Sequence, residues 1–275
     1  SSAIGSGVMT GDFNTAVGYL AGDALTTGSV NVFVGSSAGL NVTTGDYNTS
    51  IGSLSMGVGV TTGDYNVALG YRAGEDLASA NTTTLVGAFA GLNLTSGINN
   101  TAVGYAALAT EDAHGWNTAV GYAALNYLNA GDDSYNTAVG SGAGAAMTTG
   151  VRNTIMGGLA GDALTTGSYN VALGRGALST EDAGSRNVAI GYEALATQNA
   201  GVSVYNTAIG FQAADHITSG VQNTIIGGLA GNAINTGDNN IVIGYNAAAS
   251  AVGVDNETVI GTTATTNAKV HGLVK

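Results

Sequence analysis

The stretch Asn14-Thr15-Ala16-Val17-Gly18 returns along the chain with small changes and at a nearly constant spacing. We call its first residue position one, and the later copies begin at Asn31, Asn48, Asn66, Thr83, Asn100, Asn117, Asn136, Asn153, Asn170, Asn187, Asn206, Asn223, Asn240 and Glu257. The step from one of these residue numbers to the next is 17, except for one step of 18 and two steps of 19. A short period kept over most of a chain indicates stacked structural repeats, in which each repeat packs only on its neighbours.

Three columns of the repeat describe a strand. Position two is β-branched and position four is a large aliphatic residue or Met in all fifteen copies, and both point to one face of an extended chain. Position three points to the other face and is apolar in every copy except that of Ser50. Because both faces are apolar, we expect both to be buried, with positions two and four inside the coil and position three against other subunits.

The rest of each copy is rich in turns. Sequences such as Thr26-Thr27-Gly28 and Thr165-Thr166-Gly167 separate the strands, and Gly supplies the positive φ that tight corners need. The chain contains no Pro, which suits strands that all donate to a hydrogen-bond ladder. So short a spacing leaves no room for a strand, a helix and two loops in each copy. The sequence therefore predicts an all-β fold, a parallel β-solenoid or β-roll of about fifteen 17-residue coils.

The longer steps define a second periodicity above the first. They divide the chain into four-coil blocks that start near residues 14, 83, 153 and 223. Thr110-Glu111-Asp112-Ala113 recurs one block later as Thr180-Glu181-Asp182-Ala183, as expected from duplication of such a block. We expect one repetitive shaft over residues 1–261, followed by an exit segment over residues 262–275.

Composition restricts the partners. The formal net charge is −12 with only 6 Lys and Arg residues, which disfavours binding of nucleic acid or an anionic membrane. No stretch approaches the roughly 20 apolar residues of a membrane-spanning helix, so we expect no membrane insertion. The chain has no Cys and cannot form disulfides.

A narrow scaffold without disulfides or metal usually needs another source of stability. We expect it to come from side-by-side association of several chains, with position three as the contact face. The residues expected at this interface are Phe33, Leu85, Ile155 and Ile225.

Positions one and five are expected to hold the coils together. Asn side chains stacked at position one can hydrogen-bond along the rod. Gly fills position five in all fifteen copies, which predicts a positive φ or a contact too close for a Cβ atom. Examples spread along the chain are Asn14, Gly18, Asn117, Gly121, Asn223 and Gly227.

The residue before the anchor, which we call position zero, is often aromatic or Arg. These residues are Phe13, Tyr47, Tyr65, Trp116, Tyr135, Arg152, Tyr169, Arg186 and Tyr205. Aromatic and Arg side chains on a surface suit binding of a sugar or a protein, but the rings could equally pack over the neighbouring coil or subunit. The candidate receptor-binding residues are Trp116, Tyr135 and Tyr205.

We predict no catalytic, cofactor-binding or metal-binding residues. His114, His216 and His271 occupy different columns of distant coils and are not expected to converge. Acidic pairs occur at Glu75-Asp76, Glu111-Asp112, Asp132-Asp133 and Glu181-Asp182. We expect them on outward loops in contact with solvent, with calcium binding or acid–base catalysis as the alternatives.

The Asn-Thr-Ala-Val-Gly-Tyr phrase with its Thr-Thr-Gly turns resembles repeats of bacteriophage tail fibres that end in a self-cleaving chaperone. It is also similar to the coils in the heads of trimeric autotransporter adhesins. The resemblance covers about residues 1–261, and the segment from Glu257 to Gly272 looks like the one that leads into the chaperone of phage fibres. It implies a homotrimer of β-rolls outside the cell, either on a virion tail or on a bacterial surface.

The expected function is that of a non-catalytic structural and adhesive fibre, most similar to a phage tail fibre. Its partners would be two further copies of the chain and a glycan or protein of the host cell surface. A bacterial trimeric surface adhesin is the alternative, and a polysaccharide-degrading spike or an ice-binding solenoid fits the sequence less well.

Overall fold

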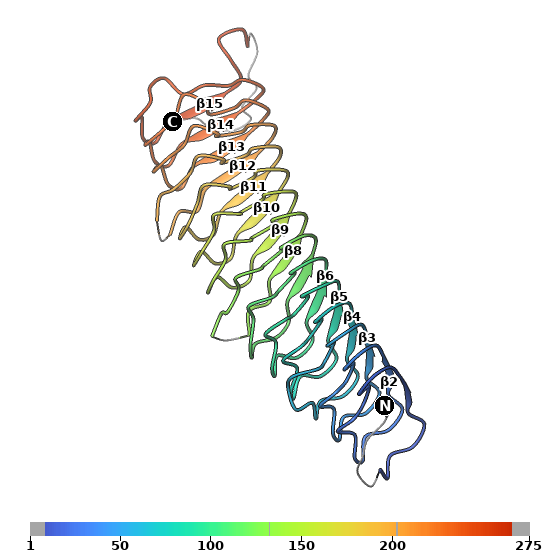
Figure 1. The fold of residues 1–275 in the computed structure, drawn as a ribbon. Coiled ribbons are helices and arrows are strands. Elements are labelled where there is room, and N and C mark those ends of the chain that lie inside the picture. The colour runs from blue at the N-terminus through green and yellow to red at the C-terminus, as the bar shows by residue number, and fades with distance from the viewer. Residues whose placement is uncertain (1–8, 132, 202, 266–275) are drawn as a thin grey trace, which may run out of the picture.

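The structure, a computed structural model, describes residues 9–131, 133–201 and 203–265. Within these ranges the chain forms one long rod of stacked coils, with the N-terminal coils at one end and the C-terminal coils at the other (Figure 1). Asp132, His271 and most of the predicted exit segment lie outside the described residues.

Each coil contributes one three-residue strand. The strands are β1 (Thr15–Val17), β2 (Val32–Val34), β3 (Thr49–Ile51), β4 (Val67–Leu69), β5 (Thr84–Val86), β6 (Thr101–Val103), β7 (Thr118–Val120), β8 (Thr137–Val139), β9 (Thr154–Met156), β10 (Val171–Leu173), β11 (Val188–Ile190), β12 (Thr207–Ile209), β13 (Thr224–Ile226), β14 (Ile241–Ile243) and β15 (Thr258–Ile260). They form one parallel sheet in chain order. The described part of the chain contains no helix. The prediction of an all-β parallel solenoid with one strand in each short coil is confirmed.

The strand register follows the repeat. In the first pair, Thr15 lies beside Val32, Ala16 beside Phe33 and Val17 beside Val34. The same offset continues to the last pair, where Val242 lies beside Val259. Each position of the repeat is therefore a column that runs along the rod.

The predicted orientation of the strands is wrong. Phe33, Leu85, Ile155 and Ile225 at position three are at most 1% exposed and belong to the core of a single chain. They cannot contact another subunit without unfolding the coil, so position three does not form the predicted subunit interface. Positions two and four point outward instead, and Val17 at position four is 58% exposed.

The core consists mainly of the side chains at positions three, eight, nine and twelve. The residues at positions three and nine compensate one another in size. In the coil of β2, the large Phe33 is matched by Gly39 at position nine, where a Cβ would collide with the Phe33 ring. In the coil of β6 the order is reversed, and Ala102 is matched by Leu108. A narrow coil has room for one large side chain at this level.

The Asn column forms a continuous hydrogen-bond ladder over most of the rod. Oδ1 of Asn14 accepts the backbone N–H of Asn31 at 2.9 Å, and Nδ2 of Asn14 donates to the carbonyl of Gly28 in its own turn at 2.9 Å. Asn223 repeats both bonds with Asn240 and Gly237. Each buried amide thus ties its own turn to the next coil.

The Gly column lets successive coils approach closely. Gly18, Gly121 and Gly227 have φ values of +139°, +135° and +136°, which L side chains rarely adopt. A Cβ on Gly140 in this column would lie 2.6 Å from the carbonyl oxygen of Gly157 in the next coil. Any larger residue at position five would therefore push two coils apart.

The size compensation between positions three and nine predicts that a substitution at one position can restore stability lost by a substitution at the other. Leu85→Ala should leave a cavity and destabilise the rod by about 2–5 kcal/mol, and Gly91→Leu alone should clash because its Cβ would lie 2.6 Å from Leu85 Cδ2. The double variant recreates the Ala102–Leu108 arrangement, in which Leu108 has φ +53°. We expect it to lose less stability than the sum of the single variants, by about 1–3 kcal/mol in a denaturation cycle.

Candidate binding surface and acidic core cluster

Position zero presents its side chain beside the start of each strand. All fifteen residues of this column have a positive φ, between +48° for Tyr135 and +66° for Trp116. This left-handed conformation turns the chain into the strand. It costs about 1–2 kcal/mol for a residue other than Gly, and somewhat less for Asn or Asp.

Six consecutive residues of this column, which we call the arginine–aromatic stack, form two groups of stacked side chains. Its members are Trp116, Tyr135, Arg152, Tyr169, Arg186 and Tyr205, and all are exposed. The Trp116 and Tyr135 rings are stacked with centroids 5.7 Å apart. The Tyr169 ring lies between the guanidinium groups of Arg152 and Arg186, each 5.5 Å from its centroid, and Arg186 also covers Tyr205 at 5.3 Å.

The candidate receptor-binding residues Trp116, Tyr135 and Tyr205 all lie in this stack. Their rings do contact neighbouring coils, as the alternative interpretation expected, and they are also 44–50% exposed. The sequence analysis placed Arg152, Tyr169 and Arg186 in the same column but did not name them as binding candidates. Their place between Tyr135 and Tyr205 in that column was the signal that could have added them.

A second aromatic row lies beyond the other end of the strands, at positions six and seven. It contains Tyr71, Phe89, Tyr105 and Tyr122, whose neighbouring rings are 5.4–5.5 Å apart. The strands between the two rows present uncharged outward side chains, which we call the outer sheet face. Large apolar examples of this face are Val17, Val32, Val67, Leu69, Met156, Ile226, Ile241 and Ile260.

Arginines of the second row are paired with carboxylates. Arg72 contacts Glu75 at 2.5 Å, and Arg175 lies 3.4 Å from Glu193. Arg175 and Glu193 also line a shallow pocket of about 410 Å³ together with Leu159 and Asp162. Partial burial raises the pKa of the Asp162 carboxyl. This pocket offers hydroxyl and carboxylate groups, but its guanidinium already has a partner.

The acidic pairs are not all in contact with solvent, which corrects the sequence prediction. Glu111 and Glu181 are fully buried, and Glu75 is 4% exposed. Glu111 and Glu181 fill position twelve, where Leu25 and Leu77 stand in other coils. A carboxylate is accommodated there because the following loop directs backbone N–H groups inward.

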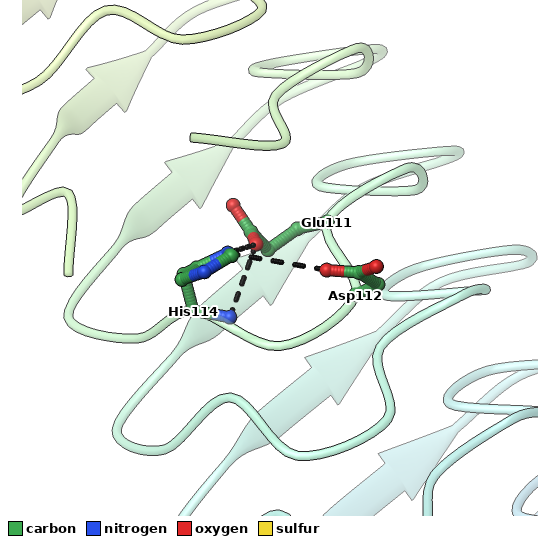
Figure 2. A group of neighbouring side chains, drawn as sticks. All are labelled: Glu111, Asp112 and His114. Atoms are coloured by element: carbon green, nitrogen blue, oxygen red, sulfur yellow. Dashed lines mark hydrogen bonds and ion pairs between the residues drawn. The ribbon is translucent and has the colours of Figure 1, made fainter. Parts of the chain in front are cut away.

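Glu111 forms a small cluster with Asp112 and His114 (Figure 2). Its Oε1 accepts the backbone N–H of His114 at 3.1 Å and lies 3.0 Å from His114 Nδ1. Asp112 Oδ1 is 3.9 Å from the same Nδ1. The other oxygen, Oε2, is buried without a hydrogen-bond partner among the described residues, and Figure 2 shows it pointing away from His114 and Asp112.

The corresponding coil of the next block, which contains Glu181, shows which hydrogen-bond donor Oε2 of Glu111 lacks. In Glu181, Oε1 accepts a hydrogen bond from the backbone N–H of Gly184 at 2.6 Å, and Oε2 accepts one from the side-chain amide Nε2 of Gln198 at 3.0 Å. The residue that corresponds to Gln198 in the block of Glu111 is Leu128, which has no polar group to donate. Burial raises the pKa of the Glu111 carboxyl, although the hydrogen bonds from His114 act in the opposite direction.

The Glu111 cluster is the one group of metal-ligating side chains within the described ranges whose donors converge. Its three donor atoms lie within 4.8 Å of one another and combine imidazole with carboxylate, a set that suits zinc or manganese. The sequence prediction missed it because Glu111 was expected to point outward. The hydrogen bond from His114 is the simpler explanation of the geometry, since a buried carboxylate requires a donor.

Comparison with protein-family models, with curated proteins and with solved structures found no match. Among the described residues, none forms a helix long and apolar enough to cross a bilayer. The surface and the cluster therefore have to be interpreted from their own chemistry.

The orphan oxygen of Glu111 predicts a pH dependence. A carboxyl whose pKa is raised on folding contributes stability that is present below its unfolded pKa and is lost as the pH rises through its folded pKa. The stability of the wild type relative to Glu111→Gln, measured by urea denaturation, should therefore fall as the pH rises above 4.5, the ordinary pKa of a glutamate. Leu128→Gln should flatten this trend by supplying a donor to the carboxylate, and an unchanged trend in that variant would contradict the assignment of Oε2.

Proposed function

We propose that this chain is the shaft of a non-catalytic structural and adhesive fibre that works outside the cell, of the kind found in phage tail fibres. The observation that carries the proposal is the outer sheet face, which is uncharged along the fifteen strands of the rod, with an aliphatic residue or Met at every position four and Thr, Val or Ile at position two. A rod with one uncharged, largely aliphatic face suits a protein that associates side by side along that face. Its remaining sides then stay available to a host surface.

The area of this face fits self-association. Fifteen strands spaced by about 4.8 Å, each roughly 10 Å long, give a surface of about 700 Å² before the flanking rows are added. Stable interfaces bury about 800 Å² per partner, and position four lines this face with an apolar side chain on every strand. No strand residue within the described chain is charged, so the face itself opposes no second copy, although the chain carries a net charge of −12.

A homotrimer is the assembly that we propose, with the outer sheet faces of three rods turned toward a common axis. The resemblance of the repeats to phage fibres and to trimeric adhesin heads supports the number three. The interface would consist of positions two and four, in place of position three, and the stacked rows at positions zero and six would lie along its borders.

Charges on the outer sheet face should separate the subunits. We expect Leu69→Glu, Met156→Glu and Ile226→Glu together to convert a trimer into monomers in light scattering, because an unpaired buried charge costs several kcal/mol. The coil should stay folded by circular dichroism, since these side chains are 37–44% exposed in the single chain.

A charge-matched control is Thr27→Glu, Thr149→Glu and Thr236→Glu, three exposed positions in the turns. It should leave the mass unchanged. A wild-type chain that is monomeric at micromolar concentration would contradict the assembly.

The adhesive part of the proposal predicts binding without turnover. Purified protein should bind bacterial envelope fragments and release no reducing sugar ends from them. Trp116→Asn with Tyr135→Asn should weaken this binding at least tenfold, because large exposed rings dominate many binding surfaces. Asn already occupies the same column at Asn99, Asn239 and Asn256, so the fold should tolerate both changes. Release of reducing ends would exclude a passive fibre.

A further inference from the structure

The positive charges of the rod are concentrated on one short section of its surface. Four arginines lie in the described residues, and Arg152, Arg175 and Arg186 fall in three consecutive coils around β9, β10 and β11. The ion pairs of the described residues include Arg72 with Glu75 and Arg175 with Glu193, but none to Arg152 or Arg186. These two guanidinium groups are exposed on a chain of net charge −12.

The column just before the stack contains no acidic residue from Asn81 to Val221, a part of the rod that includes Arg152 and Arg186. Toward the ends of the rod it contains Asp46 and Asp255, whose carboxylates accept the backbone N–H groups of Ser29 and Asp238 at 2.6 and 2.8 Å. In the coils of Arg152, Tyr169 and Arg186 the column contains no acidic residue.

Ser performs the same structural task in this section. Ser168 Oγ accepts the N–H of Val151 at 3.1 Å, and Ser185 Oγ accepts the N–H of Ser168 at 3.0 Å. Both residue types satisfy the backbone, so the difference between them is the negative charge. Its absence leaves the field of Arg152 and Arg186 uncompensated locally.

The guanidinium groups are held in place but keep free donors. Arg152 donates one bond to the Tyr169 hydroxyl at 2.6 Å, and Arg186 donates one to Ser203 Oγ at 3.2 Å. A guanidinium has five N–H donors, and stacking on a ring restricts its plane. Each group can therefore receive a carboxylate through two parallel hydrogen bonds with little further ordering.

We propose, on the basis of the proposed adhesive function, that the arginine–aromatic stack binds an acidic glycan whose carboxylates pair with Arg152 and Arg186. The two arginines are two coils apart, a separation of roughly 10 Å along the rod. Trp116 and Tyr135 continue the same row with exposed ring surface, on which the apolar faces of sugar rings can pack. The ligand class is a linear polymer with recurring uronic-acid-type groups that lies along the stack.

A glycan fits this row better than an acidic peptide does. The row repeats at the constant spacing of the coils and combines aromatic with cationic groups over six coils without any deep pocket. Such a surface offers ring stacking and charge pairing in a regular order, which matches a regular polymer of rings more closely than a chain of flexible acidic side chains.

The experiment titrates the assembled protein with polygalacturonate and, in parallel, with the same polymer after methyl esterification of its carboxyls. Arg152→Asn with Arg186→Asn removes both free cations in a conformation that Asn adopts in this column. The matched control is Arg72→Gln with Arg175→Gln, which removes two arginines that already have carboxylate partners. Polyglutamate and dextran sulfate serve as comparison polyanions.

We expect polygalacturonate to bind at least tenfold more tightly than its ester and than polyglutamate, with an affinity that falls as salt is added. The Arg152 and Arg186 variant should lose at least tenfold of this affinity, while the Arg72 and Arg175 variant should retain it. The proposal is overturned if both variants bind equally, if the ester binds as well as the acid, or if polyglutamate or dextran sulfate binds more tightly.

Envelope binding by the same samples separates the two proposals. If the double Asn variant at Arg152 and Arg186 keeps its affinity for polygalacturonate and still binds envelope fragments fully, the acidic glycan is wrong and the adhesive fibre stands. If the wild type binds neither envelope nor any glycan, the adhesive function itself fails.

Discussion

The rod depends on the requirement that each coil hydrogen-bonds in register with the coils before and after it. A three-residue strand has little stability of its own, so every backbone group that faces along the axis must meet its partner in the next coil. The Asn ladder satisfies this requirement at the corner where the strand begins, as the bonds from Asn14 to Asn31 and Gly28 show. The Gly column satisfies it at the other corner, where the coils approach too closely for a Cβ atom.

The same requirement explains which parts of the structure could be predicted. The spacing of the anchors predicts the coil length, the parallel order and the register, because any slip would break the ladder. The inner and outer faces could not be assigned from hydrophobicity, since Val17 and Phe33 are both apolar although one is exposed and the other is buried. Size was the available signal. Most residues at position three are Ala, as in Ala102, because the interior of the coil is narrow.

Glu111 could not be placed by a rule that puts charges outside. Aligning position twelve would have shown it in the column of Leu25, but not why a carboxylate is tolerated there. The reason is local, because the loop after this position turns its N–H groups toward the interior, as those of His114 and Gly184 show. Gln198 donates a hydrogen bond to the second carboxylate oxygen of Glu181, whereas the second oxygen of Glu111 has no hydrogen-bond partner among the described residues.

A solenoid also separates structural demands from the choice of surface residues, because the backbone demand is the same in every coil. At position zero the left-handed backbone favours Asn, which Asn99 and Asn239 provide, yet Trp116 and Arg186 adopt it with bulkier side chains. Beside them, Ser185 replaces an Asp that would serve the backbone equally well. Both choices depart from what folding alone would select, and they occur in neighbouring columns of the same coils. Phe13, Tyr47 and Tyr65 adopt the same left-handed backbone in other coils, so backbone strain does not distinguish this section from the rest of the column. What distinguishes it is that Arg186 stands beside the uncharged Ser185, and this exposed cation next to a neutral column is what supports the recognition surface proposed there.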